Sequence, residues 1–333
     1  MGKIVKVLVT GVGMGIGYGA IKALRREFGN SIKIVGVDAK KLSVGFYMAN
    51  KSYVVPLANK PSYVPTMIEI CKKERIDVVL PCTDHELLPL AMSMEDFGRV
   101  GSKVIVSPLD TINTCRDKWL TYTALHNKLP IVRSALPNND NLEKALQFVH
   151  LPAILKPRGG HGSKNIYKIN SLDDAYNFIK YIPNPVIQAW IDGREYTVDC
   201  LADKEGKILC VVPRVRIETI AGFSSVGMTV RNDKLIRIGK ELGRLLKFVG
   251  PFNFQVRERD GEPHIIEINP RLAGSANISL EAGVNLAGIT VRNALNMDIP
   301  DRIDFKDGII VLRYIENIVI TKDEQMAGNI YEI

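Results

Sequence analysis

The chain has 333 residues, 46% hydrophobic and 24% charged, which is enough for two or three domains with apolar cores. Its formal net charge of +8 suits anionic small molecules, although a mildly basic solvated surface would explain it equally well. We expect no nucleic-acid or membrane partner, because no dense Lys/Arg block and no apolar run of about 18 residues is present. The five scattered cysteines and the N-terminus without a signal-peptide pattern predict reduced thiols and a cytoplasmic protein.

The first 110 residues alternate between strand and helix patterns, which indicates a parallel sheet wound with helices. The predicted strands are 4–10, 32–38, 77–81 and 103–107, and the predicted helices are 17–28, 62–74 and 85–92. Ligands of such sheets bind beyond the carboxyl ends of the strands. A glycine-rich turn, Asp38 and the acidic pair Asp84 and Glu86 all follow predicted strands, so we expect them at that edge.

The remainder of the chain has short strands joined by tight turns, which predicts antiparallel sheets and an α+β arrangement. Helices are predicted at 117–127, 142–149, 172–181 and 234–248. Strands are predicted at 131–136, 153–156, 165–169, 186–191, 195–202, 207–212, 252–258, 264–268 and 308–314, and a mobile substrate loop at 221–227. We therefore divide the chain into an α/β domain (1–110), a small lid subdomain (111–190) and a C-terminal subdomain (191–333).

The first glycine turn allows a dehydrogenase hypothesis. Residues 15–20 satisfy the G-x-G-x-x-A pattern, and Asp38 could accept the ribose hydroxyls of NAD. Tyr176, Lys180 and Ser163 have the spacing of the catalytic residues of short-chain dehydrogenases. However, Ser163 lies in a glycine-rich turn between two predicted strands, and the helix predicted for Tyr176 is short. An NAD(P)-dependent oxidoreductase of the short-chain type therefore stays as the alternative.

The second glycine loop begins directly after Lys156, which ends a predicted strand. Glycines in a loop let backbone N–H groups approach an anion without interference from a Cβ atom. This is not a P-loop, because the lysine precedes the glycines and a strand follows. A hairpin over phosphates fits the pattern, with an ordinary mobile hairpin as the alternative. The loop residues are Gly159, Gly160, His161, Gly162 and Ser163.

A third pattern predicts a metal site. Glu267 and Asn269 share one face of their strand because they are two residues apart. A three-residue turn at 260–262 would place Gln255 opposite Glu267 in a hairpin. One carboxylate and two amide oxygens on a single sheet face are suitable ligands for Mg²⁺.

Taken in chain order, these residues resemble the ATP-grasp superfamily. The resemblance extends over 117–281, and a single ATP-grasp unit of the carbamoyl phosphate synthetase large subunit is most similar. The first 110 residues resemble the Rossmann-like pre-ATP-grasp domain more loosely. The resemblance implies a two-part ATP-grasp domain and an ADP-forming ligase. Such an enzyme activates a carboxylate as an acyl phosphate, which an amine or thiol then attacks. The residues on which the resemblance rests are Lys118, Lys156, the loop 159–162, Gln188, Glu195, Gln255 and the Glu267-x-Asn269-Pro270-Arg271 sequence.

The resemblance also implies roles for individual residues. Lys118, Lys156 and the glycine loop would contact the phosphates of ATP. Gln188 and the segment Ala189, Trp190 and Ile191 would face adenine, and Glu195 would bind the ribose. Gln255, Glu267 and Asn269 would hold Mg²⁺ or Mn²⁺. The catalytic residues would be Arg271, Lys156 and Asn269.

Two departures from the superfamily leave the function open. Glutamate is common where this chain has Gln188 and Gln255, so a catalytically inert nucleotide-binding module is a third hypothesis. The chain also holds one ATP-grasp unit where the synthetase large subunit holds two, and it has no glutaminase signature.

Several residues are candidates for binding small-molecule carboxylate and amine substrates. Asp84 and Ser275 could instead cap helices, and the two arginines could lie on a solvated sheet edge. The identity of both substrates and the oligomeric state stay open, with a homodimer as one option. The substrate candidates are Gly13, Asp84, Glu86, Arg214, Arg216 and Ser275.

Overall fold

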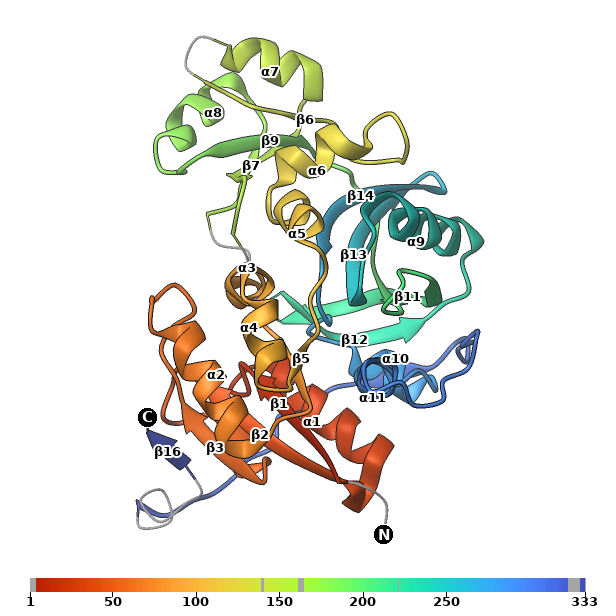
Figure 1. The fold of residues 1–333 in the computed structure, drawn as a ribbon. Helices are drawn as coiled ribbons and strands as arrows, with labels where there is room; N and C mark the ends of the chain where they lie inside the picture. The colour runs from red at the N-terminus through yellow and green to blue at the C-terminus, as the bar shows by residue number, and fades with distance from the viewer. Residues whose placement is uncertain (1–3, 139–140, 161–164, 221, 323–329, 333) are drawn as a thin grey trace.

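The computed structural model describes residues 4–138, 141–160, 165–220, 222–322 and 330–332. It contains three sheets, each from a different part of the chain (Figure 1). The N-terminal sheet lies at the bottom of Figure 1, the small four-stranded sheet at the top, and the larger antiparallel sheet between them on the right.

The first sheet has six strands in the order β16-β3-β2-β1-β4-β5, and all of its pairings are parallel, as predicted. Val7 and Val9 of β1 pack into the core beneath α1, whereas Leu8 joins the core beneath α2 and α3, so both faces are covered. Two strands were not predicted: β3, and β16 near the end of the chain, which pairs with β3. The strands are β1 (Val5–Thr10), β2 (Ile32–Asp38), β3 (Lys51–Val54), β4 (Val78–Leu80), β5 (Lys103–Val104) and β16 (Ile330–Glu332).

Four α-helices belong to this N-terminal region, together with two short 3₁₀ helices at Gly29–Ser31 and Val44–Tyr47. Thr83 caps α3 in a capping box, in which the side chain of Glu86 accepts from the N–H of Thr83. The helices are α1 (Gly15–Phe28), α2 (Tyr63–Glu74), α3 (Asp84–Met92) and α4 (Met94–Arg99).

The second sheet has the order β14-β13-β10-β11-β12-β15 and is antiparallel, as predicted for this half of the chain. One face packs on α9 through apolar residues such as Val198, Phe254 and Leu242. Residues 223–229 form the strand β12, so the prediction of a mobile loop there was wrong. The strands are β10 (Arg194–Ala202), β11 (Ile208–Ile220), β12 (Phe223–Thr229), β13 (Gly250–Arg259), β14 (Glu262–Asn269) and β15 (Ile310–Leu312), and the helices are α9 (Asp233–Leu246), α10 (Asn277–Glu281) and α11 (Leu286–Ala294).

The third sheet has the order β6-β9-β7-β8 and packs on α7 and α8. Two consecutive helices, α5 and α6, connect the N-terminal domain to it (Figure 1). The strands are β6 (Ser134–Ala135), β7 (Ala153–Pro157), β8 (Tyr167–Ile169) and β9 (Pro185–Ala189), and the helices are α5 (Leu109–Arg116), α6 (Lys118–Leu125), α7 (Leu142–Val149) and α8 (Leu172–Ile179).

The hairpin of β13 and β14 confirms one predicted residue pairing, but its turn is shorter than predicted. Gln255 lies opposite Glu267, as predicted. The turn contains two residues rather than three, because Arg259 already pairs with Glu262. Asp260 and Gly261 both have positive φ (55° and 73°), which a tight two-residue hairpin turn requires. A bulge between Gln255 and Val256 then restores the expected pairing.

Candidate active site

The second face of the large sheet is polar, and cross-strand pairing arranges its side chains in rows. Gln255 lies opposite both Glu267 and Thr197, and Asn253 lies opposite both Asn269 and Asp199. Directly opposed residues of antiparallel strands project from the same face. The alternate residues of these strands, such as Val198 and Phe254, fill the apolar core behind them. The sheet therefore presents a block of carboxylate and amide groups to the rest of the molecule.

Lys156 brings the third sheet to this block. Lys156 is the next-to-last residue of β7, and only 7% of its surface is exposed. Burial and, to a smaller extent, the nearby Lys118 lower the pKa of its ammonium group to about 8, and Glu267 partly opposes this change. These influences require both side chains to lie near Lys156. The structure thus brings together two predicted phosphate ligands and one predicted metal ligand.

The position of Lys118 depends on two residues that the sequence analysis did not select. Asp117 caps α6 by accepting from the N–H groups of Trp119 and Leu120. Its carboxylate also pairs with the guanidinium of Arg158 at 2.5 Å. The Lys118 Nζ lies 3.3 Å from the carbonyl oxygen of Gly160 in the second glycine loop. The start of α6 and the start of the glycine loop are therefore fixed to each other.

The described part of the glycine loop includes Gly159 and Gly160, and the latter has φ of +115°, a conformation that favours glycine. His161, Gly162 and Ser163 lie outside the described residues, so their predicted contacts with phosphate stay predictions.

The segment predicted to face adenine ends β9. The Nε2 of Gln188 donates to the hydroxyl oxygen of Ser134, and the amide oxygen Oε1 is buried without a partner among the described residues. The N–H groups of Ala189 and Trp190 donate to the carbonyl oxygens of Arg133 and Pro152. These two amides are therefore engaged by the protein, whereas Gln188 Oε1 is a buried side-chain acceptor without a partner among the described residues.

Trp190 and Ile191 are held by an arginine that was not predicted. The guanidinium of Arg257 lies 4.4 Å from the centre of the Trp190 ring and donates to the carbonyl oxygen of Ile191. Lys168 lies over the same indole ring at 4.6 Å. The indole of Trp190 thus has cations around it.

Glu195, the predicted ribose ligand, is paired on both carboxylate oxygens. Oε1 lies 2.7 Å from Nη1 of Arg216, and Oε2 lies 3.0 Å from Nη2 of Arg257. Burial lowers the pKa of Arg216, an effect that Glu195 opposes. Arg216 consequently belongs to the same polar face as Glu195 and Glu267 rather than to a solvated sheet edge.

The predicted metal ligands differ in how free their oxygens are. Asn269 accepts from Nη2 of Arg271 and donates to Asn253, so its amide is engaged. The side chains of Gln255 and Glu267 have no hydrogen-bond partner among the described residues, and the two residues lie opposite each other. A carboxylate beside an amide oxygen is a fitting donor set for Mg²⁺, which uses one or two protein carboxylates and retains water. Within the described ranges, no group of three or more His, Cys, Asp or Glu residues could hold a metal.

Arg271 connects the polar face to the N-terminal domain. Its Nη2 lies 2.6 Å from Oδ2 of Asp84, the first residue of α3. Nη1 donates to the carbonyl oxygen of Leu272, and the buried Nε has no partner among the described residues. Asp84 therefore lies at the site through this arginine, at the carboxyl edge of the first sheet as predicted.

Two further substrate candidates, Glu86 and Gly13, make hydrogen bonds within the protein itself. The buried Glu86 accepts from the hydroxyl groups of Thr10 and Tyr63, so it stabilises the start of α3 rather than facing a ligand. Burial raises the pKa of Glu86. The N–H of Gly13 donates to Asp38 at 2.8 Å, which also engages the carboxylate that the dehydrogenase hypothesis requires.

Arg214, which lies opposite Thr197 on the polar face of the sheet, forms a buried pair with Ser275. Arg214 is fully buried, its Nε and Nη2 donate to the two oxygens of Asp199, and its Nη1 donates to Ser275. Ser279 also donates to Asp199. These contacts give Arg214 and Ser275 a structural role, and their predicted contact with substrate stays a prediction.

Comparison with known proteins gives family matches in two parts of the chain. Residues 182–317 match the model of a family described as "ATP-grasp in the biosynthetic pathway with Ter operon", and residues 7–105 match that of "PylC-like, N-terminal domain". The carbamoyl phosphate synthase large chain of Methanothermobacter thermautotrophicus is 26% identical over 314 residues, which are 86% of this chain and 29% of the relative. The arginine-specific large chain of Geobacillus stearothermophilus is 25% identical, covering 93% and 31%. The chain thus spans less than a third of these relatives.

Solved structures share the fold at low sequence identity. A biotin carboxylase–β-γ-ATP complex from Campylobacter jejuni superposes with a TM-score of 0.74 at 15% identity, covering 92% of this chain and 74% of that chain. The ADP complex of N5-carboxyaminoimidazole synthetase from Staphylococcus aureus gives a TM-score of 0.72 at 15% identity, covering 92% and 81%.

Residues 182–317 thus match an ATP-grasp family and residues 7–105 a PylC-like N-terminal domain, and the chain shares its fold with the solved structures above. Within that class, the chain is similar over most of its length to one portion of carbamoyl phosphate synthase large chains. The matches do not favour the oxidoreductase alternative.

Proposed function

We propose that this protein is an ATP-dependent, ADP-forming ligase that joins a carboxylate to an amine or thiol. The observation that carries the proposal is the convergence of Lys156, Lys118 and Glu267, which come from different sheets and helices onto one polar face. Phosphoryl transfer depends mainly on positioning and on neutralising the charge of the phosphates. Two lysines beside an acidic metal ligand supply both requirements.

The nucleotide would lie between the third sheet and the polar face of the second. Lys118 and Lys156 would contact its phosphates, and the unpartnered Oε1 of Gln188 would accept from the exocyclic amino group of adenine. A buried acceptor without a partner is unfavourable, so a ligand donor at this position would contribute to binding.

Gln255 and Glu267 are the residues that would hold Mg²⁺ or Mn²⁺, with Asn269 joining them if Arg271 releases its amide oxygen. An ion held by these residues would supply positive charge that neutralises part of the charge on the phosphates. The engaged state of Asn269 makes Gln255 and Glu267 the principal pair in this proposal.

The chemistry would proceed in two displacements. A carboxylate oxygen of the substrate attacks the γ-phosphorus of ATP, the bond to the β–γ bridging oxygen breaks, and ADP leaves. The nitrogen or sulfur nucleophile then attacks the acyl carbon, inorganic phosphate leaves, and the nucleophile loses its proton to solvent. Arg271, together with Lys156, would stabilise the negative charge on the transferred phosphoryl group.

Small carboxylates and amines are the partners that this reaction needs, and the cytoplasm is the compartment that we propose for it. In the described part of the chain, no helix combines the length and apolar character that crossing a bilayer requires. A homodimer is a hypothesis that sedimentation equilibrium would test.

Calorimetric titration with ADP and Mg²⁺, compared with NADH, tests the class of ligand directly. The proposal requires saturable binding of ADP–Mg²⁺ and none of NADH; the reverse result would restore the oxidoreductase alternative. ATP-dependent phosphate release, screened with pooled carboxylates and amines, then separates a ligase from an inert nucleotide-binding module. Release that requires both an acid and an amine supports the ligase, whereas ADP binding without any release supports the inert module.

A further inference from the structure

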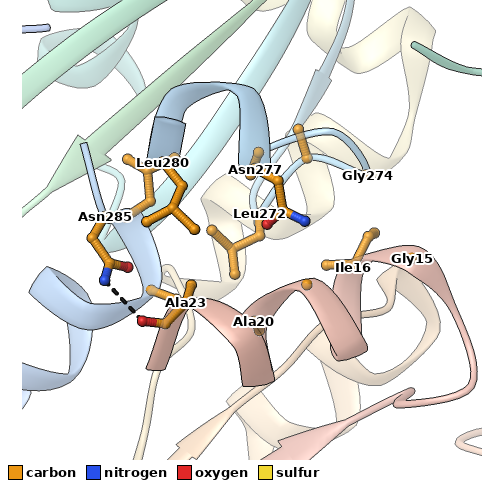
Figure 2. A pocket seen from close by; sticks show the side chains of 14 residues that line it. Gly15, Ile16, Ala20, Ala23, Leu272, Gly274, Asn277, Leu280 and Asn285 are labelled. Atoms are coloured by element: carbon orange, nitrogen blue, oxygen red, sulfur yellow. Dashed lines mark hydrogen bonds between the residues drawn. The ribbon is translucent and has the colours of Figure 1, made fainter. Parts of the chain in front are cut away.

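A groove outside the proposed nucleotide site lies between α1 and the segment that follows β14. Figure 2 shows Gly15 and Ile16 at the start of α1 facing Leu272, Gly274 and Asn277 across this groove. The groove therefore lies between the N-terminal domain and the larger antiparallel sheet. Its inner part is lined by apolar residues such as Ala20 and Leu280.

Arg313 lies at the Gly15–Gly274 end of this groove. Its backbone N–H donates to the carbonyl oxygen of Ser225, and its Nη1 donates to the carbonyl oxygen of Ser224 at 3.2 Å. Its Nη2 lies 3.6 Å from the point where a Cβ atom on Gly15 would stand, and the carbonyl oxygen of Gly274 lies 3.7 Å from that point. The guanidinium and the carbonyl group of Gly274 thus both lie beside the start of α1.

The charge of Arg313 is not balanced locally. No carboxylate of the described residues lies within ion-pair distance of its guanidinium, whereas the nearby Arg271 is paired with Asp84. The first turn of α1 contains no acidic residue, and its cap residue Met14 makes no side-chain capping bond. An uncompensated guanidinium beside such a helix start favours a negatively charged ligand.

Unpartnered hydroxyl groups lie on the same strand that positions Arg313. Only 1% of the surface of Ser224 is exposed, and its Oγ has no hydrogen-bond partner among the described residues. The Oγ of Ser225 is likewise buried and unpartnered within that set. Phe223, the preceding residue, packs against Gly274, so this strand adjoins the groove. Buried polar atoms of this kind normally have a partner.

We propose that Arg313 is a substrate-binding residue that holds a carboxylate group at the Gly15–Gly274 end of this groove. The inference rests on the proposed ligase function, because Arg271 in the adjoining segment is the residue proposed to serve the phosphoryl group. One uncompensated positive charge matches a carboxylate, and a guanidinium edge can bind both oxygens of that group. The substrate class is therefore small molecules that carry a carboxylate apart from the group that reacts, such as amino acids and dicarboxylic acids.

The direct test observes the Arg313 side chain by NMR of the full-length protein labelled with ¹⁵N-arginine, with the resonance assigned from R313K. Sodium acetate and inorganic phosphate are titrated separately, with sodium chloride as the matched ionic-strength control. We expect a saturable shift of the Arg313 resonance with acetate and none with chloride. Equal responses to acetate and chloride would overturn the proposal, and a response to phosphate alone would assign the site to phosphate and also overturn it.

The functional test compares R313A with R237A, which removes an arginine from the exposed side of α9 on the opposite face of the sheet. With the acid and amine found in the phosphate-release screen, R313A should raise KM for the carboxylate-bearing substrate roughly 10- to 100-fold, as loss of a charged hydrogen bond does. R313K should recover part of this loss, and R237A should match the wild type. An unchanged KM in R313A would contradict the assignment.

ADP–Mg²⁺ binding by the same variants separates this inference from the proposed function. Normal ADP binding in R313A, combined with impaired use of the carboxylate substrate, supports both. If the wild type fails to bind ADP–Mg²⁺, the proposed function fails whatever the acetate titration shows. If ADP binds and acetate does not shift the Arg313 resonance, the inference alone fails.

Discussion

Asp84 and Arg271 form an ion pair at 2.6 Å that joins the N-terminal domain to the end of β14. Their side chains are 8% and 12% exposed, so the pair is largely removed from solvent. The residue proposed to stabilise the transferred phosphoryl group is thus positioned by a carboxylate from another domain.

In D84N we expect kcat to fall about 10- to 100-fold with ADP affinity unchanged, because Arg271 would lose the partner that orients it. D96N, which disrupts an exposed pair with Arg99, is the control and should leave kcat unchanged. Equal kcat in D84N and wild type would refute the positioning role.

The lowered pKa of Lys156 predicts a pH dependence of nucleotide binding. Its pKa is about 8 because of burial and the nearby Lys118, and bound phosphates would favour the charged form. ADP affinity should therefore decrease as the pH rises through about 8, with uptake of a proton on binding above that value. Calorimetry in buffers of different ionisation enthalpy measures this uptake.

Substitution of Lys156 provides the control for that measurement. K156A should bind ADP more weakly and lose the proton uptake, whereas K144A, on the exposed face of α7, should retain both. Between about pH 8 and 10.5 the unfolded chain binds more protons at residue 156 than the folded chain. The contribution of Lys156 to the free energy of unfolding should therefore rise with pH across this window. Proton uptake that persists in K156A would assign the titrating group elsewhere.

Glu267 should be needed for metal binding but not for folding. Because its carboxylate has no hydrogen-bond partner among the described residues, E267Q removes the charge without breaking a contact. We expect loss of Mn²⁺ binding, followed by electron paramagnetic resonance, and loss of phosphate release, with an unchanged melting temperature. E262Q, which lies at the exposed start of the same strand and pairs with Lys234, should bind Mn²⁺ normally. Normal Mn²⁺ binding by E267Q would remove this residue from the metal site.

Gln188 should contribute to recognition of the base. Q188L removes the unpartnered Oε1 and should weaken ADP binding about 10-fold while affecting inorganic tripolyphosphate little. The matched control is S134A, which removes the partner of Nε2 and leaves Oε1 in place. Equal loss of affinity for ADP and tripolyphosphate in Q188L would indicate a general structural defect instead.

The buried pair of Asp199 and Arg214 should dominate local stability. D199A leaves a fully buried guanidinium without its counterion, so we expect a loss of about 3–5 kcal/mol in the free energy of unfolding. E281A breaks the exposed pair with Arg26 and should cost no more than about 1 kcal/mol. Urea denaturation of both variants measures the difference, and similar values would contradict the structural role assigned to Arg214.

The sequence allowed the fold class and the pairing of Gln255 with Glu267 to be predicted, because side-chain alternation along strands is a local property. The ion pairs that now surround Glu195 could not be predicted, since Arg216 and Arg257 approach it from two neighbouring strands. The length of the turn at Asp260 was misjudged, although Asp-Gly is itself a signal for a two-residue turn. The strand β12 was not predicted because its serine and glycine residues interrupt the alternation of apolar and polar side chains that marks a strand.

The pairing of β16 with β3 brings residues 330–332 into the same parallel sheet as β1. The rings of Tyr331 and Tyr53 contact each other in a tilted arrangement with centres 5.3 Å apart, and Lys51 lies over the Tyr331 ring. The chain therefore connects the N-terminal domain to the remainder of the molecule twice, once after β5 and once before β16. Deleting residues 330–332 should remove this strand pairing and allow the N-terminal domain to rotate further relative to the rest of the molecule. Every proposed ligand-binding side chain would stay in place.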